Sequence, residues 1–372
     1  MSYKFIIAGG GTSGHINPAI TIADALKKYY GDRNEECDIL FVGRENSLES
    51  ELVSKAGYEM KYIQAKPFPM RPNKKMVVAL KALRHGRHSV EKLIDEFKPD
   101  AVIGTGGYVC APLFSAASVK KIPAVIHESN AFPGRLNRLE GRRAALVLTG
   151  FPDLDKDFPK AGKVVYTGNP IRSIMFNNEY SECRRKLGID ETQKLVFAMG
   201  GSLGAKTIND FIIKCASDSD FADVKFVLGS GKQQTGKLDS SIKTPDNLTI
   251  MEYIDNPNEY LCGADVSITR AGAVTCAEIA AIGACNIFVP YPYAAQNHQT
   301  FNASAFSDSN GGILMSDSEV EDGKLVPVLK DLLKDDKKRA EMRANAGKLA
   351  VNDCNDRIVG AISVLVEERR NA

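Results

Sequence analysis

The sequence predicts an α/β protein of two doubly wound, Rossmann-like domains that face each other across a cleft. Three observations lead to this prediction. The chain has 372 residues, which is too long for one ordinary core. Short apolar runs alternate with segments of helical period, as in parallel sheets covered by helices. The order strand, glycine-rich turn, helix begins near residue 4 and begins again near residue 195.

The composition is that of a globular protein, with 44% hydrophobic and 25% charged residues. A net charge of +2 does not exclude a local charged patch. The eight cysteines form no CxxC pair, and the first residues lack signal-peptide organisation, so we expect reduced, mostly buried thiols in the cytosol. No run approaches the roughly 20 apolar residues that span a bilayer, and we expect a soluble chain.

The first domain is predicted over residues 1–167. Its expected elements are a strand at 4–8, a glycine run at 9–14, a helix at about 18–29, a strand at 38–43, a helix near 46–56, and strands within 101–108 and 123–130. Ligands of such sheets bind beyond the carboxyl ends of the strands. The glycines, His15, Tyr108 and the segment HESN at 127–130 fall at those ends.

The second domain is predicted over residues 168–353, after a Gly-Asn-Pro sequence that would break a helix or strand. Its expected elements are a helical stretch at 181–188 and strand-containing segments at 195–205, 225–231, 248–254, 265–273 and 286–293. A last helix at about 356–369 has apolar residues on one side, and we expect residues 354–372 to pack back on the first domain.

Three glycine turns, at 9–14, 104–107 and 200–204, follow predicted strands. Such a turn lets the backbone approach a phosphate while the next helix offers its N–H groups. Gly9, Gly11 and Gly14 match GxGxxG, but the acid expected at the end of the second strand is missing, which disfavours an NAD-dependent dehydrogenase. Tight packing of helix on strand is the alternative explanation.

The segment 265–302 contains several candidate ligands for a nucleotide sugar. Arg270 ends a predicted strand, residues 271–273 form a small-residue turn, and Thr275 and Glu278 fall in the first turns of the next helix. A helix N-terminus beside an arginine suits a diphosphate, and the Glu278 carboxylate can accept hydrogen bonds from ribose hydroxyls. A plain helix-dipole role is the alternative for Glu278. The amides of the segment 296–302 suit sugar hydroxyls, unless this segment is a polar surface loop.

Seven motifs occur in order over nearly the whole chain: GGGTSGHINPA, GTGGYVCAP, HESNAFPGRLNR, TGNPIR, GGSLGA, RAGAVTCAE and NHQTFNA. Together they resemble the family of bacterial cell-wall glycosyltransferases of GT-B type that add N-acetylglucosamine to undecaprenyl-pyrophosphoryl-muramyl-pentapeptide. The resemblance implies inverting transfer from UDP-N-acetylglucosamine to the C4 hydroxyl of the muramyl sugar of lipid I, giving lipid II for peptidoglycan. It implies no required cofactor, with stimulation by a divalent metal left open. It also implies a peripheral enzyme at the cytoplasmic face of the plasma membrane.

The resemblance and the residue chemistry together give an expected site. The donor-binding residues are Thr12, Ser13, Gly14, Asn130, Arg172, Ser202, Ile254, Arg270, Ala273, Val274, Thr275, Glu278 and Gln299. Gly106, Gly107 and Tyr108 are expected to meet the acceptor. The role of His298 stays open.

The reaction needs a base for the acceptor hydroxyl and positive groups for the leaving diphosphate. His15 follows the first glycine turn and has an ordinary pKa of about 6.5, which suits a base. Glu128 is the competing base, and a histidine that only packs the loop is the alternative for His15. The acidic runs 153–157 and 218–220 are expected to be solvated surface rather than metal ligands.

Residues 60–90 contain no acid and eight cations: Lys61, Lys66, Arg71, Lys74, Lys75, Lys81, Arg84 and Arg87. Apolar residues are interleaved with them, among them Phe68, Met70, Met76, Val77, Leu80 and Leu83. Cations beside an apolar stripe suit an anionic membrane surface, and we expect contact through Lys74, Lys75, Leu80, Lys81 and Arg84. Few aromatic residues and a low net charge disfavour nucleic acid. A helix whose apolar face belongs to the core is the alternative.

Two further functions compete with the transferase. One is another UDP-sugar enzyme on the same fold, either a glycolipid glycosyltransferase or a UDP-N-acetylglucosamine 2-epimerase. The other is a non-catalytic sugar-nucleotide-binding or scaffold subunit of a membrane assembly, which His15, Glu278 and Gln299 disfavour.

Overall fold

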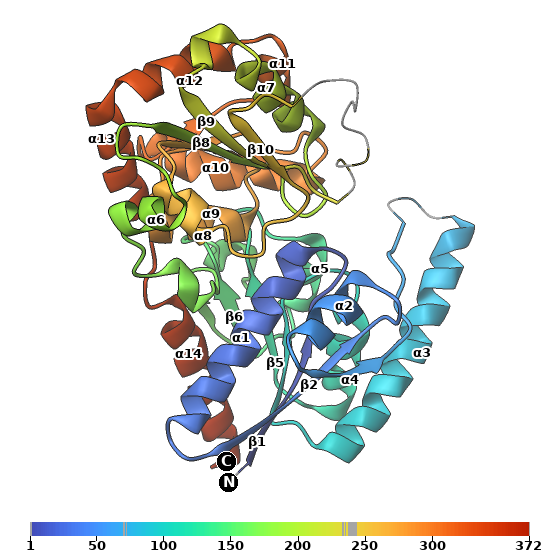
Figure 1. The fold of residues 1–372 in the computed structure, drawn as a ribbon. Coiled ribbons are helices and arrows are strands. Elements are labelled where there is room, and N and C mark those ends of the chain that lie inside the picture. Colours follow the sequence, from blue (N-terminus) through green and yellow to red (C-terminus); the bar gives the residue numbers. More distant parts are fainter. Residues whose placement is uncertain are drawn as a thin grey trace. The chain divides into compact units, whose positions relative to one another are not determined.

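The computed structural model describes residues 2–69, 71, 73–232, 234, 236 and 244–371. The chain forms two compact units (Figure 1). The first contains the residues up to Ile171 together with those from Asp353 on, and the second contains Arg172–Asn352. Each unit holds one sheet of parallel strands with helices on its faces, which confirms the predicted fold class of two Rossmann-like domains.

The first unit contains a seven-stranded sheet of order β3-β2-β1-β4-β5-β6-β7 among the described residues. Alternate residues of β1 enter different core clusters: Phe5 and Ile7 belong to one, Ile6 and Ala8 to the other. Both faces of this sheet are therefore buried, as in other parallel sheets. The strands are β1 Ser2–Ala8, β2 Glu36–Gly43, β3 Glu59–Tyr62, β4 Ala101–Gly104, β5 Ala124–Glu128, β6 Leu146–Thr149 and β7 Val164–Tyr166.

The helices of the first unit cover the two faces of its sheet. The C-terminal helix α14 lies beside α1 (Figure 1), and its apolar residues join the cluster that contains Phe5 and Ile7. Residues of α3 and α4 join the other cluster. The helices are α1 Ser13–Gly31, α2 Leu48–Lys55, α3 Lys74–Phe97, α4 Cys110–Lys120, α5 Arg135–Glu140 and α14 Cys354–Arg370, with a short 3-10 turn η1 at Asp155–Asp157.

The second unit contains a six-stranded sheet of order β10-β9-β8-β11-β12-β13 among the described residues. Its strands are β8 Lys194–Met199, β9 Val224–Gly229, β10 Leu248–Met251, β11 Val266–Thr269, β12 Asn286–Phe288 and β13 Ile313–Leu314. Its helices are α6 Tyr180–Lys186, α7 Lys206–Ala216, α8 Asn258–Gly263, α9 Ala273–Ile282, α10 His298–Asp308, α11 Asp317–Glu321, α12 Leu325–Lys334 and α13 Asp336–Gly347, with 3-10 turns η2 Ser173–Met175, η3 Ser219–Phe221 and η5 Ala295–Asn297.

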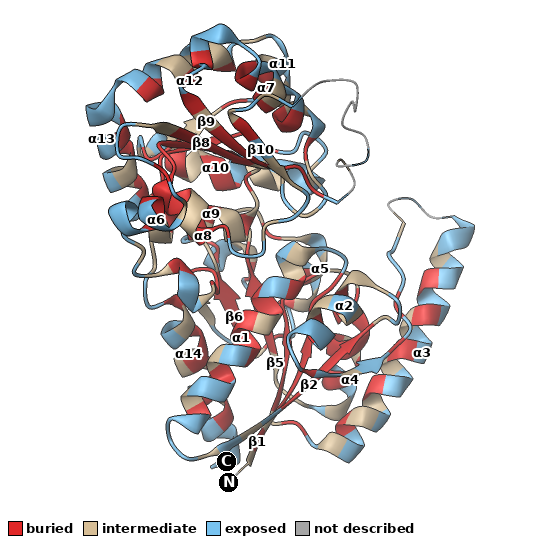
Figure 2. Ribbon diagram, viewed as in Figure 1, coloured by how far each residue is buried: buried red, intermediate tan, exposed pale blue. Residues whose placement is uncertain are grey.

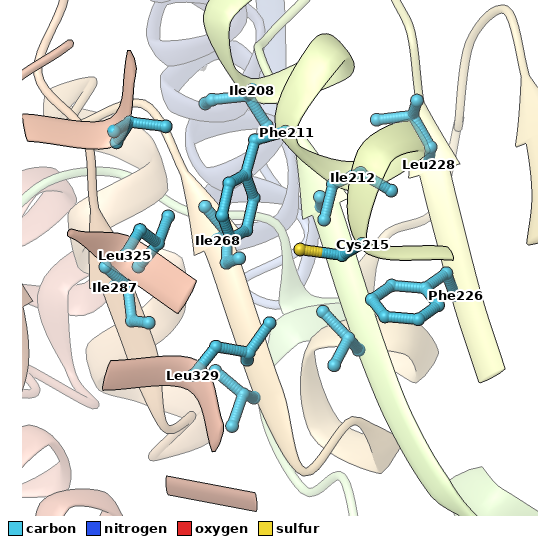
Figure 3. Packing of buried hydrophobic residues seen from close by; sticks show 14 of the residues in the cluster. Ile208, Phe211, Ile212, Cys215, Phe226, Leu228, Ile268, Ile287, Leu325 and Leu329 are labelled. Carbon is cyan, nitrogen blue, oxygen red and sulfur yellow. The ribbon is translucent and has the colours of Figure 1, made fainter. Parts of the chain in front are cut away.

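The core of the second unit packs α7 and α12 on the sheet. Phe211 of α7 lies in one cluster with Ile268 of β11 and Leu329 of α12 (Figure 3). The strands of this sheet are mostly buried, whereas the outer faces of the helices are exposed (Figure 2). Each fully buried side chain of this size stabilises the fold by about 1.5–3 kcal/mol, so this core can hold the glycine turns in place.

The six strands of the second sheet follow the same order as β3 to β6 of the first sheet, which has β7 in addition, and each sheet has a switch point where the order reverses. In the first sheet β1 lies between β2 and β4, and in the second β8 lies between β9 and β11. The glycine turns 9–14 and 104–107 follow β1 and β4, while the segments 200–204 and 270–273 follow β8 and β11. The predicted motifs therefore lie at the two switch points, where open α/β sheets bind ligands.

Three local features differ from the sequence-based expectation. Helix α1 begins at Ser13 rather than near Pro18, because the Thr12 carbonyl already accepts the N–H groups of His15 and Ile16. Strand β12 ends at Phe288, since the prolines of the following VPYPY segment cannot donate to a ladder. The short strands β3, β6, β7 and β13 were not predicted.

The cysteines are free thiols, seven of them buried and Cys37 half-buried, as predicted.

Candidate functional site

The first two glycine turns pack against each other. The Gly10 N–H donates to the Gly106 carbonyl at 3.3 Å. At Gly107, where φ is +81°, a Cβ would lie 2.1 Å from the Gly10 carbonyl oxygen. Only glycine fits this contact without moving the backbone. The expected phosphate-binding turn and the expected acceptor turn are thus one continuous surface at the ends of β1 and β4.

His15 lies in the first turn of α1, beside this surface. Its Nδ1 is 3.3 Å from the Thr12 hydroxyl. A Cβ on Gly106 would lie 2.7 Å from the imidazole, so the ring rests against the glycine backbone. The buried Thr105 hydroxyl donates to the His15 carbonyl at 2.7 Å. His15 is half-buried and Thr12 is exposed, so the imidazole is fixed by its neighbours at the rim of the turn.

Glu128, the other candidate base, ends β5 and is 1% exposed. Its Oε1 accepts hydrogen bonds from the backbone and side-chain amides of Asn130, and its Oε2 accepts them from Gly134 N–H and Asn137 Nδ2. These four hydrogen bonds, between 2.8 and 3.1 Å, fix the loop that follows the strand. The carboxylate therefore organises this loop and holds Asn130 in position.

In the second unit, Arg172 and Glu278 come together with the segment after β10. The Arg172 guanidinium donates to the Asp255 carbonyl at 2.8 Å and lies 3.6 Å from Glu278 Oε1. The Glu278 side chain is 10% exposed, whereas that of Arg172 is 40% exposed. Burial raises the pKa of Glu278 to about 7, against the opposing effect of the Arg172 charge. Ile254 adjoins this cluster and packs on Gly229 at the end of β9.

The N-terminus of α9 lies where the sequence predicts it. Gly272 precedes the helix, Thr275 is its third residue and Glu278 its sixth. The glycine turn 200–204 carries Ser202, whose carbonyl accepts the Lys232 N–H at 3.2 Å. Gly204 packs on the next turn, since a Cβ there would lie 2.1 Å from the Ser230 carbonyl.

Arg270 ends β11, as expected, but its guanidinium is occupied by protein acceptors. It donates to the carbonyls of Val289 and Pro290 at 3.0 and 3.1 Å and forms a bidentate ion pair with Asp317. Its side chain is 11% exposed. Through these contacts, Arg270 links the end of β11 to the loop after β12 and to the start of α11. A direct contact with the diphosphate stays a prediction.

The polar residues expected to meet the sugar hydroxyls lie in the 3-10 turn η5 and at the start of α10, where hydrogen bonds of their own side chains order them. Gln299 Oε1 accepts the Tyr291 N–H at 2.8 Å, which fixes the direction of the side-chain amide. His298 Nδ1 lies 2.7 Å from the Ala295 carbonyl, so the structure gives this histidine a local role in the turn. The buried Asn302 donates to the Ala271 carbonyl at 3.1 Å and joins α10 to the turn before α9.

Helix α3 exposes the cations and the apolar residues of the basic segment together. Its buried residues are Ala79, Ala82, Gly86, Val90 and Ile94. Figure 2 shows buried and exposed stretches alternating along this helix. Val77, Val78 and Leu80 are 56%, 45% and 48% exposed. The expected contact residues Lys74, Lys75, Lys81 and Arg84 are exposed as well. These seven residues are called the α3 patch below; Met70 lies outside the described residues.

The two acidic runs give no metal site. Asp153, Asp155 and Asp218 are exposed, and Asp220 pairs with Lys330. In the part of the chain that the structure describes, no three His, Cys, Asp or Glu side chains are grouped to hold a metal ion. The described helices also include none that is long and apolar enough to cross a membrane.

Sequence reasoning missed two residues beside the first glycine turn, Arg44 and Glu49. Glu49 is fully buried and accepts hydrogen bonds from Arg44 and from the Gly11 N–H. A signal was present, since Glu49 is an acid in the first turn of a helix that follows a buried strand. An acid there is usually a surface dipole partner, and sequence alone does not show its burial.

Both halves of the chain match known protein families. Residues 5–149 match the Glycosyltransferase family 28 N-terminal domain, and residues 195–358 match the Glycosyltransferase family 28 C-terminal domain. The two matches and the two Rossmann-like units define a glycosyltransferase of GT-B type.

Curated relatives define the family more narrowly. The UDP-N-acetylglucosamine–N-acetylmuramyl-(pentapeptide) pyrophosphoryl-undecaprenol N-acetylglucosamine transferase of Acetivibrio thermocellus is 37% identical over 371 residues, 98% of this chain and 99% of the relative. The transferase of the same name from Halalkalibacterium halodurans is 37% identical over 333 residues, 89% and 90% of the two chains. This chain belongs to that family of N-acetylglucosamine transferases.

Solved structures agree with this assignment. The crystal structure of Acinetobacter baumannii MurG is similar, with a TM-score of 0.74, 25% identity, and coverage of 98% of this chain and 99% of that chain. A UDP-N-acetylglucosamine 2-epimerase from Neisseria meningitidis has a TM-score of 0.64 at 16% identity, covering 97% and 99% of the two chains. That likeness shows the shared fold alone, and the epimerase alternative is not favoured.

Proposed function

We propose that this chain transfers N-acetylglucosamine from UDP-N-acetylglucosamine to lipid I, the undecaprenyl-pyrophosphoryl-muramyl-pentapeptide, and so produces lipid II for peptidoglycan. The observation that carries the proposal is the match of 98% of the chain, both halves included, to transferases of that name. The transfer is an inverting displacement. The acceptor C4 oxygen forms a bond to the anomeric carbon, the bond from that carbon to the diphosphate oxygen breaks, and UDP leaves.

We assign donor binding to the second unit. Glu278 is buried and only partly compensated by Arg172, so its carboxylate gains from hydrogen bonds that ribose hydroxyls donate. The α9 N-terminus at Ala273, Val274 and Thr275 offers N–H groups to the diphosphate, together with the turn at Ser202. The Ile254 backbone meets the uracil, and the oriented Gln299 amide meets the sugar hydroxyls.

We assign the base to His15 rather than Glu128. The imidazole lies at the rim of the first glycine turn, beside the exposed Thr12 hydroxyl. Glu128 has four protein donors and 1% exposure, so taking a proton would cost it hydrogen bonds that order the loop. His15 receives the C4 hydroxyl proton as the new bond forms. Asn130, which Glu128 holds, and the segment Thr12–Gly14 then serve as contacts of the first unit with the donor.

We assign the acceptor pyrophosphate to the surface formed by the first two glycine turns. Their backbones approach so closely that Gly107 has no room for a side chain, and an anion can therefore lie directly against the glycine backbone of this surface. Gly106, Gly107 and Tyr108 are the residues of this surface that meet the acceptor. Neutralisation of the leaving UDP by helix N–H groups requires no metal in this scheme, and stimulation by a divalent metal remains open to assay.

The α3 patch gives the proposed enzyme a route to its lipid substrate. Val77, Val78 and Leu80 are exposed next to four cations, as suits the interface of an anionic membrane. We propose peripheral attachment through this patch at the cytoplasmic face of the plasma membrane, where UDP-sugars are available.

The test is transfer of labelled N-acetylglucosamine from UDP-N-acetylglucosamine to lipid I in detergent. We expect a labelled lipid product only when lipid I is present. Omission of lipid I tests the epimerase directly, since an epimerase converts the nucleotide sugar without an acceptor. A chain that binds the donor but produces neither lipid II nor an epimer would contradict the proposal and support the scaffold alternative.

A further inference from the structure

A buried acid lies beneath the first glycine turn and has no part in the chemistry above. The Glu49 side chain has no exposed surface. Its Oε1 accepts Arg44 Nε at 2.8 Å, and its Oε2 accepts Arg44 Nη2 and the Gly11 N–H, both at 3.4 Å. The hydrogen bonds and the charge of Arg44, together with backbone N–H groups, outweigh the effect of burial and lower the pKa of this carboxyl.

The glycines around Glu49 leave no spare space. A Cβ at Gly10 would lie 3.3 Å from the Glu49 carboxyl carbon, and a Cβ at Gly43 would lie 3.1 Å from its Cγ. Gly11 has a φ of +89°, a conformation that side-chain-bearing residues seldom adopt. The carboxylate therefore fills the space below the turn and bonds the amide of the residue with the unusual backbone.

Arg44 links the same acid to the second glycine turn. Its guanidinium lies 5.2 Å from the centre of the Tyr108 ring, within the range of a cation–π contact. A Cβ at Gly11 would lie 3.8 Å from that ring, so Tyr108 covers the first turn. The Arg44 side chain is 35% exposed, which places the pair at the edge of the acceptor surface. One ion pair thus contacts both turns.

We propose that Arg44 and Glu49 are a positioning pair for the acceptor: Glu49 fixes the Gly11 amide, Arg44 fixes the Tyr108 ring, and together they hold the two glycine turns ready for the acceptor pyrophosphate. This inference rests on the proposed transferase function. A buried ion pair adds little stability over an apolar replacement, but loss of one partner leaves an uncompensated charge. The arrangement of the turns is therefore the property that this pair maintains.

The chain contains a matched control at the other end of β1. Asp100 accepts a bidentate ion pair from Arg370 and also the Lys4 N–H at 2.8 Å, and its side chain is 17% exposed. Like Glu49, Asp100 accepts two hydrogen bonds from an arginine and one from a backbone N–H, but it lies away from the glycine turns. Asp100→Asn should cost stability in the same way as Glu49→Gln without touching the acceptor surface.

The experiment measures KM for lipid I and kcat at saturating donor, with donor affinity by calorimetry, for the unaltered chain, Glu49→Gln and Asp100→Asn. We expect Glu49→Gln to raise the acceptor KM by about tenfold or more, the scale of one charged hydrogen bond, with donor affinity unchanged. Asp100→Asn should keep both kinetic constants at a comparable loss of melting temperature. Equal acceptor KM in Glu49→Gln and the unaltered chain would overturn the inference.

Arg44→Ala supplies a second test, because the Arg44 side chain is 35% exposed and added guanidinium can therefore reach the place that it leaves beside Glu49. We expect a raised acceptor KM that millimolar guanidinium partly restores and that equal urea does not. An unchanged KM, or a defect that neither additive alters, would reject the positioning role. Absence of transfer by the unaltered chain would instead refute the proposed function itself.

Discussion

Replacement of Glu278 by glutamine removes the charge from the buried carboxyl and keeps its size. Two opposite effects are expected from this one change. Donor binding weakens, because the ribose hydroxyls lose an ionised acceptor. The protein becomes more stable near pH 8, because burial disfavours the ionised carboxyl in the empty site.

Both effects have magnitudes that follow from the structure. Loss of one hydrogen bond to a charged group costs about 1.5–3 kcal/mol, or about 10- to 150-fold in donor affinity. A pKa raised from 4.5 to about 7 corresponds to about 3 kcal/mol of destabilisation of the ionised form. Between these pH values the folded chain binds more protons at Glu278 than the unfolded chain, so stability falls as pH rises. In the Glu278→Gln variant, this decrease of stability with rising pH is absent, because glutamine does not ionise.

Calorimetry with UDP-N-acetylglucosamine from about pH 5.5 to 8 and thermal melts over the same range measure both effects. The donor diphosphate is esterified at both ends and keeps its charge across this range, so a pH dependence reports on the protein. Well below pH 7, the donor affinity of the unaltered chain should fall by about tenfold for each unit by which the pH is lowered, because the Glu278 carboxyl must lose a proton before the donor binds. Glutamine at 278 should remove that dependence. Glu182→Gln, at an exposed position in the second unit, is the control and should change neither quantity.

Either of two results would contradict this expectation. If Glu278→Gln binds the donor as tightly as the unaltered chain, the carboxylate does not meet the ribose. If affinity falls and the melting temperature at pH 8 falls too, Glu278 is a structural partner of Arg172 and not a group held ready for a ligand.

Three further predictions concern the first unit. His15→Ala should lower kcat by about 10²–10⁴ with little change in donor affinity, because only the base is lost; equal kcat, measured by single-turnover transfer, would contradict that role. Gly106→Ala should destabilise the chain by about 1–3 kcal/mol and lower kcat, since φ is +118° and the new Cβ would meet the His15 ring; unchanged melting and kcat would refute the packing argument. Charge reversal of the four cations of the α3 patch should weaken binding to anionic vesicles in flotation assays by about 4 kcal/mol, or about 10³-fold; these cations are Lys74, Lys75, Lys81 and Arg84. Vesicle binding that persists in this variant would exclude the α3 patch as the membrane contact. The control variant reverses four exposed lysines of the second unit: Lys206, Lys214, Lys337 and Lys348.

The sequence predicted the fold well where periodicity and glycine turns agree. The strand before Gly9 and the helix after Gly272 lie at the predicted places, since a buried strand and a small-residue turn leave few alternatives. The predicted start of α1, near Pro18, was wrong by several residues, since the helix begins at Ser13. Pro18 lies inside the helix at the cost of one backbone hydrogen bond. Strand β3 has four half-buried or exposed residues and carries almost no apolar signal.

The candidate site was less predictable, because the tasks of its side chains depend on neighbours distant in sequence. Arg270 seemed available for a diphosphate, yet its partner Asp317 lies 47 residues further along the chain. His15 was the preferred base and Glu128 its competitor, and the sequence does not show the four hydrogen-bond donors that surround Glu128. Glu49 has no motif of its own, and its partner Gly11 is 38 residues away.

Glu49 and Glu278 show how one fold gives two buried acids opposite tasks. Glu49 has an arginine fork and a backbone amide within hydrogen-bond distance, and these lower its pKa although it is completely buried. Glu278 is also buried, but its arginine stands 3.6 Å away and shares its N–H groups with the Asp255 carbonyl, so burial dominates and the pKa rises. A compensated acid gains nothing from a ligand and can only hold its surroundings in place. An under-compensated acid gains stability when a ligand donates to it, and this difference is why we assign Glu49 to the architecture of the acceptor surface and Glu278 to the nucleotide.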